Sequence, residues 1–129
     1  MKKKLRKILK IAIDSPAAAG AGTLAKSISN NYNLLYLDTG KIYRYIAHLK
    51  ITSPKKFNYS FVKKKIKKMN TKILENKKLI EDKVGTEASI ISKDKKIRNL
   101  VHGFQLKFAY FPPKKYKGSC LDGRDITYN

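Results

Sequence analysis

Short apolar runs alternate with helical patterns in the first part of the chain. Ile8–Ile13 is mostly apolar and predicts a buried strand, whereas Thr23–Asn31 has the spacing of an amphipathic helix. Leu34–Leu37 predicts a second strand, and Lys41–Leu49 a second helix. Such alternation favours a parallel sheet with right-handed crossovers. The inward-facing positions of the two helices are Leu24, Ile28, Ile42, Tyr45, Ile46 and Leu49.

Two further helices are predicted in the middle of the chain. Ser53 and Pro54 have the pattern of an N-cap followed by proline in the first turn, and the helix after them would expose its lysines. A second helical stretch runs from Thr86 toward Tyr110, until Pro112 and the next proline end it. The apolar positions of these helices are Phe57, Phe61 and Met69 in the first, and Ile97, Leu100, Val101, Phe104 and Phe108 in the second.

A small hairpin is predicted between these helices, because Thr71–Leu74 and Lys78–Ile80 flank the polar segment at 75–77. Ser119–Leu121 predicts a third buried strand near the end of the chain. Each of the three strands runs into polar or small residues, and ligands of open parallel sheets bind beyond the carboxyl ends of the strands. Aspartate and glycine are also ordinary turn residues, so this pattern alone leaves both interpretations open. The strand-end segments are Asp14-Ser15, Asp38-Thr39-Gly40 and Asp122–Asp125.

Length and charge narrow the class of protein. A chain of 129 residues with 42% apolar composition suits one small domain. Its 30 basic and 9 acidic residues give a formal charge of +21, which suits nucleic acid, a membrane surface or nucleoside phosphates as partner. Only Arg6, Arg44, Arg98 and Arg124 among the basic residues are arginine. Because a guanidinium fork grips phosphate bidentately and an ammonium does not, arginines in a lysine-rich chain are candidate site residues.

A few residues indicate the cellular compartment and whether a metal site is expected. Cys120 is the single cysteine, which excludes an intrachain disulfide and fits a reducing cytoplasm. The basic start imitates a secretory leader, but Lys10 and Asp14 interrupt its apolar region, and no run has transmembrane length. His48 and His102 lack partners at metal-ligand spacing, so we expect no protein metal site.

The segment Lys10–Ser29 has the layout of a phosphate-binding loop between a strand and a helix. The motif is G-x-x-x-x-G-K-[ST], and here Ser15 stands at the first glycine, Gly20 at the second and Ala21 at the lysine, before Gly22 and Thr23. On the loop alone, an alanine-rich turn entering an amphipathic helix is the better interpretation, since degenerate glycine motifs are common.

Four separate segments together are more specific than the loop. The loop, Asp38–Arg44 (DTGKIYR), Ala88–Arg98 (ASIISKDKKIR) and Leu121–Thr127 (LDGRDIT) resemble the bacterial cytidylate kinases, in that order and from about Ile8 to Asn129. The resemblance implies an α/β fold: a P-loop NTPase-like parallel sheet with three strands present, without the family's remaining strands and lid, and with a helical and hairpin substrate-binding insertion. The chain is then a single incomplete nucleoside monophosphate kinase domain (1–129). Within it, 8–49 carries the phosphate loop and first substrate segment, 50–110 the CMP-binding insertion, and 118–129 the third strand and DGRD segment.

The resemblance also implies an activity. Enzymes of this family transfer the terminal phosphoryl group of ATP to CMP or dCMP, giving CDP or dCDP, with Mg²⁺ bound mainly through the nucleotide phosphates. We therefore expect a cytoplasmic protein that binds ATP, CMP and dCMP, is monomeric at full length, and has neither a membrane nor nucleic acid as partner. The missing strands and lid predict a chain truncated at its C-terminus, with an exposed sheet edge.

Site residues follow position by position from the resemblance. Arg44 would face the acceptor phosphate, while Ser89 and Arg98 would read the cytosine through a hydroxyl and a guanidinium. Arg124 and Asp125 would contact phosphate and the pentose hydroxyls. The catalytic set is Arg44, Arg124 and Asp125. ATP would be held by Ser15, Pro16, Ala17, Ala18, Ala19, Gly20, Ala21, Gly22 and Thr23, and the substrate by Asp38, Thr39, Tyr43, Arg44, Ser89, Arg98, Arg124 and Asp125.

Structural roles compete with some of these assignments. Tyr43 would also suit the core, and Ser89 a helix-entry cap. Ala21 replaces the lysine that spans the donor phosphates, and losing one preorganised donor costs on the order of 3 kcal/mol, roughly a hundredfold in rate. Ser15 and Ala18 replace glycines of the family. We hypothesise that a lysine of the basic N-terminal stretch compensates. The alternatives are a non-catalytic nucleotide-binding fragment of such a kinase and a basic nucleic-acid-binding module.

Overall fold

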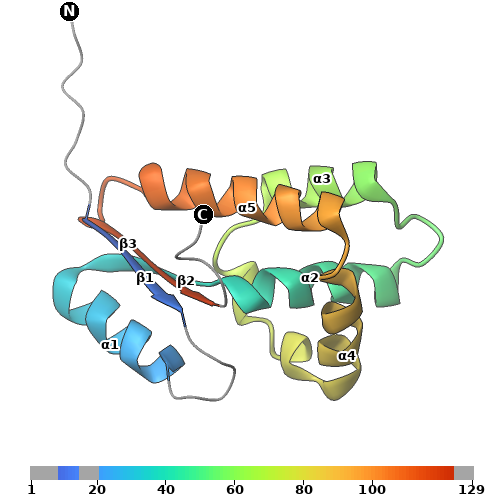
Figure 1. Cartoon of the computed structure of the whole chain (residues 1–129), viewed down its shortest axis with the longest axis horizontal. Helices are drawn as coiled ribbons and strands as arrows, with labels where there is room; N and C mark the ends of the chain where they lie inside the picture. Colours follow the sequence, from blue (N-terminus) through green and yellow to red (C-terminus); the bar gives the residue numbers. More distant parts are fainter. Residues whose placement is uncertain (1–8, 15–20, 124–129) are drawn as a thin grey trace, which may run out of the picture. The chain divides into compact units, whose positions relative to one another are not determined.

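A computed structural model describes residues 9–14 and 21–123, and these form two compact units (Figure 1). The first is built around a sheet and contains the described residues up to Asp38 and from Leu106 onward. The second is helical and consists of Thr39–Gln105. The chain therefore passes from one unit to the other between Asp38 and Thr39, and again inside its last helix.

The sheet unit has three parallel strands in the order β1-β3-β2. These are β1 (Leu9–Asp14), β3 (Gly118–Gly123) and β2 (Leu34–Asp38), and helix α1 (Ala21–Tyr32) contacts all three. The predicted parallel sheet and the α/β fold class are confirmed. The Cys120 side chain is fully buried beside Leu34, with Ile28 of α1 packed against them, as the apolar pattern predicts.

The sheet register brings the carboxyl ends of the strands together. Asp122 of the central strand is aligned with Ile13 of β1 and with Asp38 of β2, while Asp14 is aligned with Gly123. The last residues of the three strands therefore lie at the same edge of the sheet. The turn before β2 depends on Asn33, which adopts a φ of 54°, a left-handed conformation that ends α1.

Helix α2 (Thr39–Thr52) is the centre of the helical unit. All four residues predicted to face inward are buried, and α4 (Asp82–Ile91) packs against them. The α4 side of this contact consists of buried apolar side chains, so the two helices share one core. No helix in the described residues is long and apolar enough to span a bilayer. The buried residues are Ile42, Tyr45, Ile46 and Leu49 on α2, and Val84, Ala88 and Ile91 on α4.

The helix predicted to begin at Ser53-Pro54 begins later. Ser53 takes part in a turn, accepting a hydrogen bond from the Lys56 amide, and α3 starts only at Tyr59 and ends at Lys68. Asn58 is its N-cap, because its side chain accepts a bond of 2.8 Å from the amide of Phe61. The prediction was therefore wrong about the start and right about the exposed lysines, Lys63, Lys64, Lys65, Lys67 and Lys68. The buried side chains are Val62, Ile66 and Met69, while Phe57 and Phe61 are half-buried.

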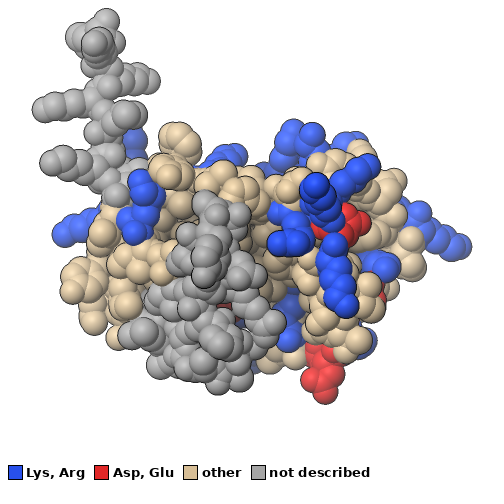
Figure 2. Space-filling model, viewed as in Figure 1, with Lys and Arg blue, Asp and Glu red and all other residues tan. Residues whose placement is uncertain are grey.

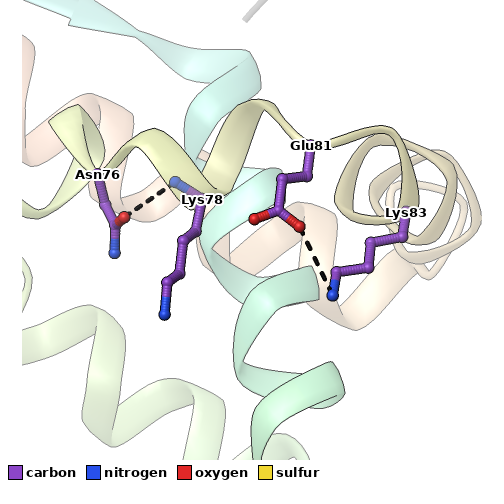
Figure 3. A network of polar contacts seen from close by, with 4 residues as sticks. All are labelled: Asn76, Lys78, Glu81 and Lys83. Carbon is purple, nitrogen blue, oxygen red and sulfur yellow. Dashed lines mark hydrogen bonds and ion pairs between the residues drawn. The ribbon is translucent and has the colours of Figure 1, made fainter.

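The predicted hairpin is also wrong. Two 3₁₀ helices replace it, η1 (Ile73–Glu75) and η2 (Lys77–Ile80), and each buries one leucine. Asn76 separates them: its ψ of 122° departs from the helical range, and its side chain accepts a hydrogen bond of 3.0 Å from the Lys78 amide (Figure 3). A local side-chain bond thus satisfies the backbone where a strand ladder was expected.

The predicted long helix is interrupted. It divides into α4 and α5 (Lys95–Tyr110), because the Asp94 carboxylate accepts bonds from the amides of Lys96 and Ile97, at 2.9 and 3.3 Å, and starts a new helix. The prolines follow its end, as predicted. The C-terminal end of α5 belongs to the sheet unit. There the Ser119 hydroxyl donates a hydrogen bond to the Ala109 carbonyl at 3.1 Å.

Candidate functional site

Only part of the predicted phosphate loop lies among the described residues. Ser15–Gly20 lie outside them, whereas Ala21, Gly22 and Thr23 form the start of α1. The order of strand, loop and helix is the predicted one, since α1 follows β1. Arg124 and Asp125 also lie outside the described residues.

The segment Asp38–Arg44 bridges the two units along the chain. Asp38 is the last residue of β2 in the sheet unit, and Thr39, only 3% exposed, is the first residue of α2 in the helical unit. Both residues are engaged in interactions. This predicted substrate segment is therefore the point where the sheet edge passes into the helices.

Tyr43 and Arg98 come together in the helical unit although 55 positions separate them in the numbering. Burial raises the pKa of the half-buried Tyr43 phenol, and the positive charge of Arg98 opposes that rise in pKa. Arg98 itself is exposed in the first turn of α5, where its amide donates to the Asp94 carbonyl at 2.9 Å. The charge of Arg98 therefore acts on the phenol of α2. Tyr43 also fits the competing prediction of a packing role.

Arg44 is held by the backbone of two other elements. Its Nη1 donates to the carbonyl oxygen of Leu79 in η2 at 2.8 Å, and its guanidinium lies against Gly85 of α4. The side chain is half-buried, so its orientation is fixed by protein contacts. An arginine held in this way presents its remaining N–H groups in a defined direction.

Ser89 lies one helical turn after Gly85 on the same face of α4. It is exposed, and its hydroxyl donates to the Gly85 carbonyl at 3.2 Å. Because α4 begins at Asp82, Ser89 lies in the helix interior, and its interpretation as a helix-entry cap is wrong. Four of the predicted substrate residues, Tyr43, Arg44, Ser89 and Arg98, therefore belong to three helices of the helical unit.

The sequence profile of the family called cytidylate kinase matches residues 11–129, which is most of the chain. The chain belongs to the cytidylate kinase family. It is similar to the cytidylate kinases of Bradyrhizobium sp. (strain ORS 278) and Bradyrhizobium diazoefficiens, each 38% identical over 117 residues, and to that of Rhodospirillum rubrum, 34% identical over 119 residues.

The alignments cover 90% of this chain but only 53% of each Bradyrhizobium protein and 55% of the Rhodospirillum one. The chain thus spans about half the length of the curated relatives that it matches. The predicted family is confirmed, and so is the fold class.

Three features of the cytidylate kinase helical unit were missed by the sequence analysis. The first two are the Leu79 carbonyl, which accepts a hydrogen bond from Arg44, and Gly85, against which the Arg44 guanidinium lies. The third is an ion pair between Lys50 of α2 and Glu87 of α4, which joins the two central helices. All three are contacts across the fold, and the predicted helix begins at Thr86, one residue after Gly85, so the sequence pattern contains no signal for any of them.

Basic residues outnumber acidic ones in this family member, 30 to 9. In Figure 2, lysines and arginines are visible over many parts of the described surface, and few acidic groups accompany them. Their spread gives a general positive potential that attracts nucleotide phosphates, while the orientation of a bound nucleotide must come from groups with fixed geometry.

Proposed function

We propose that this protein transfers the terminal phosphoryl group of ATP to CMP or dCMP, producing CDP or dCDP in the cytoplasm. The observation that carries the proposal is the grouping of Tyr43, Arg44, Ser89 and Arg98 in one compact unit of a cytidylate kinase family member. Two of these are arginines, in a chain whose other basic residues are nearly all lysine. Guanidinium groups are the side chains suited to a nucleotide phosphate and a base edge.

The reaction needs no protein nucleophile. A phosphate oxygen of CMP attacks the γ-phosphorus of ATP, a new P–O bond forms, and the bond between that phosphorus and the β,γ-bridging oxygen breaks to release ADP. The protein must position the two nucleotides and neutralise charge on the transferred group. In this scheme Arg44 binds the acceptor phosphate, while Arg98 and Ser89 recognise cytosine.

The donor nucleotide is assigned to Ser15–Thr23, with Arg124 and Asp125 on phosphate and the pentose. Magnesium would arrive with ATP and be bound mainly through its phosphates, where it neutralises their charge. The part of the chain that the structure describes holds no group of three or more Asp, Glu, His or Cys side chains that could bind a metal ion, so this scheme leaves the ion to the nucleotide phosphates.

Calorimetric titration of CMP, UMP and AMP, each with and without Mg²⁺ and ATP, tests the proposal. We expect CMP to bind more tightly than UMP or AMP, with little salt dependence, and a coupled assay to show ADP formation that requires CMP. CMP binding without turnover would favour the non-catalytic alternative, for which Ala21 is the specific observation. Absence of CMP binding together with tight, strongly salt-dependent RNA binding would favour the nucleic-acid module and overturn the proposal.

A further inference from the structure

Gly85 leaves room for the guanidinium of Arg44 on the surface of α4. A Cβ atom at position 85 would lie 2.9 Å from Nη2 of Arg44 and 3.2 Å from both Cζ and Nη1. These distances are shorter than an ordinary van der Waals contact. A Cβ at position 85 would therefore force the guanidinium to shift from its observed position, by at least a few tenths of an ångström.

The Leu79 carbonyl fixes the same guanidinium from another element. Leu79 is 1% exposed, and its carbonyl accepts from Nη1 at 2.8 Å. Polar contacts hold both ends of η2: Asn76 accepts from the Lys78 amide before Leu79, and Glu81 pairs with Lys83 at 3.5 Å after it (Figure 3). The carbonyl is therefore held in place by its own element as well as by burial.

We propose that Gly85 is a positioning residue that, together with the Leu79 carbonyl, orients Arg44 for the acceptor phosphate. This inference rests on the proposed function. A free arginine loses rotamer entropy when it binds phosphate, whereas one already held in its binding geometry loses less. With Nη1 occupied by a carbonyl and the face of the group against α4, the other N–H groups of Arg44 remain for the phosphate.

Gly85 lies inside α4, so its effect on helix stability can be separated from its effect on Arg44. Glycine in a helix interior lowers stability relative to alanine. Gly103, in the interior of α5, is a matched control, because a Cβ there would meet nothing within 4 Å. Both alanine substitutions gain helix propensity, and only the one at 85 must displace Arg44.

The first experiment compares Gly85→Ala with Gly103→Ala by CMP calorimetry and thermal unfolding. We expect Gly103→Ala to raise the melting temperature and leave the Kd for CMP unchanged. Gly85→Ala should raise the Kd for CMP about tenfold or more, because a hydrogen bond between a charged group and the phosphate is lost. The melting temperature should not fall to match. Equal CMP affinities of the two variants would overturn the inference.

A double-mutant cycle separates positioning from a general structural role. In an Arg44→Lys background, the alanine at 85 meets no guanidinium, so its effect on CMP affinity should nearly vanish. The same fold-change in both backgrounds would contradict the proposal. If Gly85→Ala alone does not fold, folding of the Arg44→Lys/Gly85→Ala protein supports it, and failure of both contradicts it.

A measurement without nucleotide keeps this inference distinct from the proposed function. The Nε–Hε NMR signal of Arg44 should shift and exchange faster with water in Gly85→Ala, and remain unchanged in Gly103→Ala. An unchanged signal in both would overturn the positioning role. If Gly85→Ala shows these signal changes but the wild-type protein binds no CMP, the positioning of Arg44 stands and the proposed function is contradicted.

Discussion

The Arg98 guanidinium lies close enough to the Tyr43 phenol to lower its pKa, against the larger effect of burial, which raises it. The phenol comes from α2 and the guanidinium from the first turn of α5. Since Arg98 is exposed, its fork is available to a ligand at this place. The pair therefore provides one charged and one aromatic group on the same part of the helical unit, and each can be tested separately.

Arg98→Lys should weaken CMP binding selectively. The substitution keeps the charge but removes the planar fork that can bond to a base edge at two points. We expect the Kd for CMP to rise by about tenfold, with little change for UMP and AMP, as measured by calorimetry. An equal loss for all three nucleotides would remove the cytosine-reading role from Arg98.

The stability of the protein should fall in alkaline solution as buried tyrosines ionise. Burial raises the pKa of Tyr43 and Tyr45 above the usual 10.0. The unfolded chain then loses its phenol protons first, so the contribution of both groups is complete below pH 10.0 and is lost as pH rises above it. Melting temperatures measured between about pH 8 and 11 should decline less in Tyr43→Phe than in wild type. Tyr59→Phe, at an exposed position, serves as control and should leave the decline unchanged.

The Lys50–Glu87 ion pair should stabilise the contact of α2 with α4. The Glu87 side chain is 21% exposed and that of Lys50 45%, so solvent screens the pair only in part. We expect Glu87→Gln to lower the free energy of unfolding by up to about 1 kcal/mol in urea denaturation. The more exposed Lys83–Glu81 pair is the comparison: Glu81→Gln should have a smaller effect. A larger loss in Glu81→Gln would show that burial does not decide the strength of these pairs.

The Asp94 cap should determine where α5 begins and how well its first turn is held. Asp94→Ala removes the acceptor for two amides and should cost about 1 kcal/mol in the free energy of unfolding. Asp94→Asn retains an acceptor oxygen and should recover most of that stability. Because Arg98 lies in this turn, Asp94→Ala should also weaken CMP binding. Wild-type affinity in Asp94→Ala would mean that the cap does not position Arg98.

The predicted elements that proved correct share a strong periodic signal. The three strands are short apolar runs, and α2 repeats apolar residues at helical spacing, so the pattern predicts the burial of β2, β3 and α2. The predicted burial of β1 was wrong, because Leu9 and Ala12 are exposed and Ile11 is half-buried.

The element boundaries that were predicted wrongly depend on single polar side chains. Asn58, Asn76 and Asp94 each accept a hydrogen bond from a backbone amide, and this bond determines where a helix begins. The spacing of apolar residues does not reveal such hydrogen bonds. By residue type alone, Ser53 before Pro54 is as good an N-cap as Asn58.

The residues of the candidate site were predicted, but the contacts that hold them in place were not. Tyr43, Arg44, Ser89 and Arg98 were found because they match family segments. The contact of Arg44 with Leu79 uses a backbone carbonyl that any residue possesses, so no side chain in the sequence indicates it. Gly85 has a recognisable residue type, but the reason for it appears only when α4 is placed beside α2.

The first residue of α1 offers a direct test of the donor site. Ala21 stands where the phosphate-loop motif has lysine, and the positive end of the α1 dipole is at this place. Ala21→Lys should add an ammonium to the phosphate contacts, tightening ATP binding and raising turnover by roughly a hundredfold, with CMP affinity unchanged. ATP calorimetry and the coupled assay measure these effects, and Ala25→Lys, one turn further along α1, controls for added charge. If both variants respond alike, charge alone is responsible; if Ala21→Lys gains nothing, another group already fills the role of the lysine.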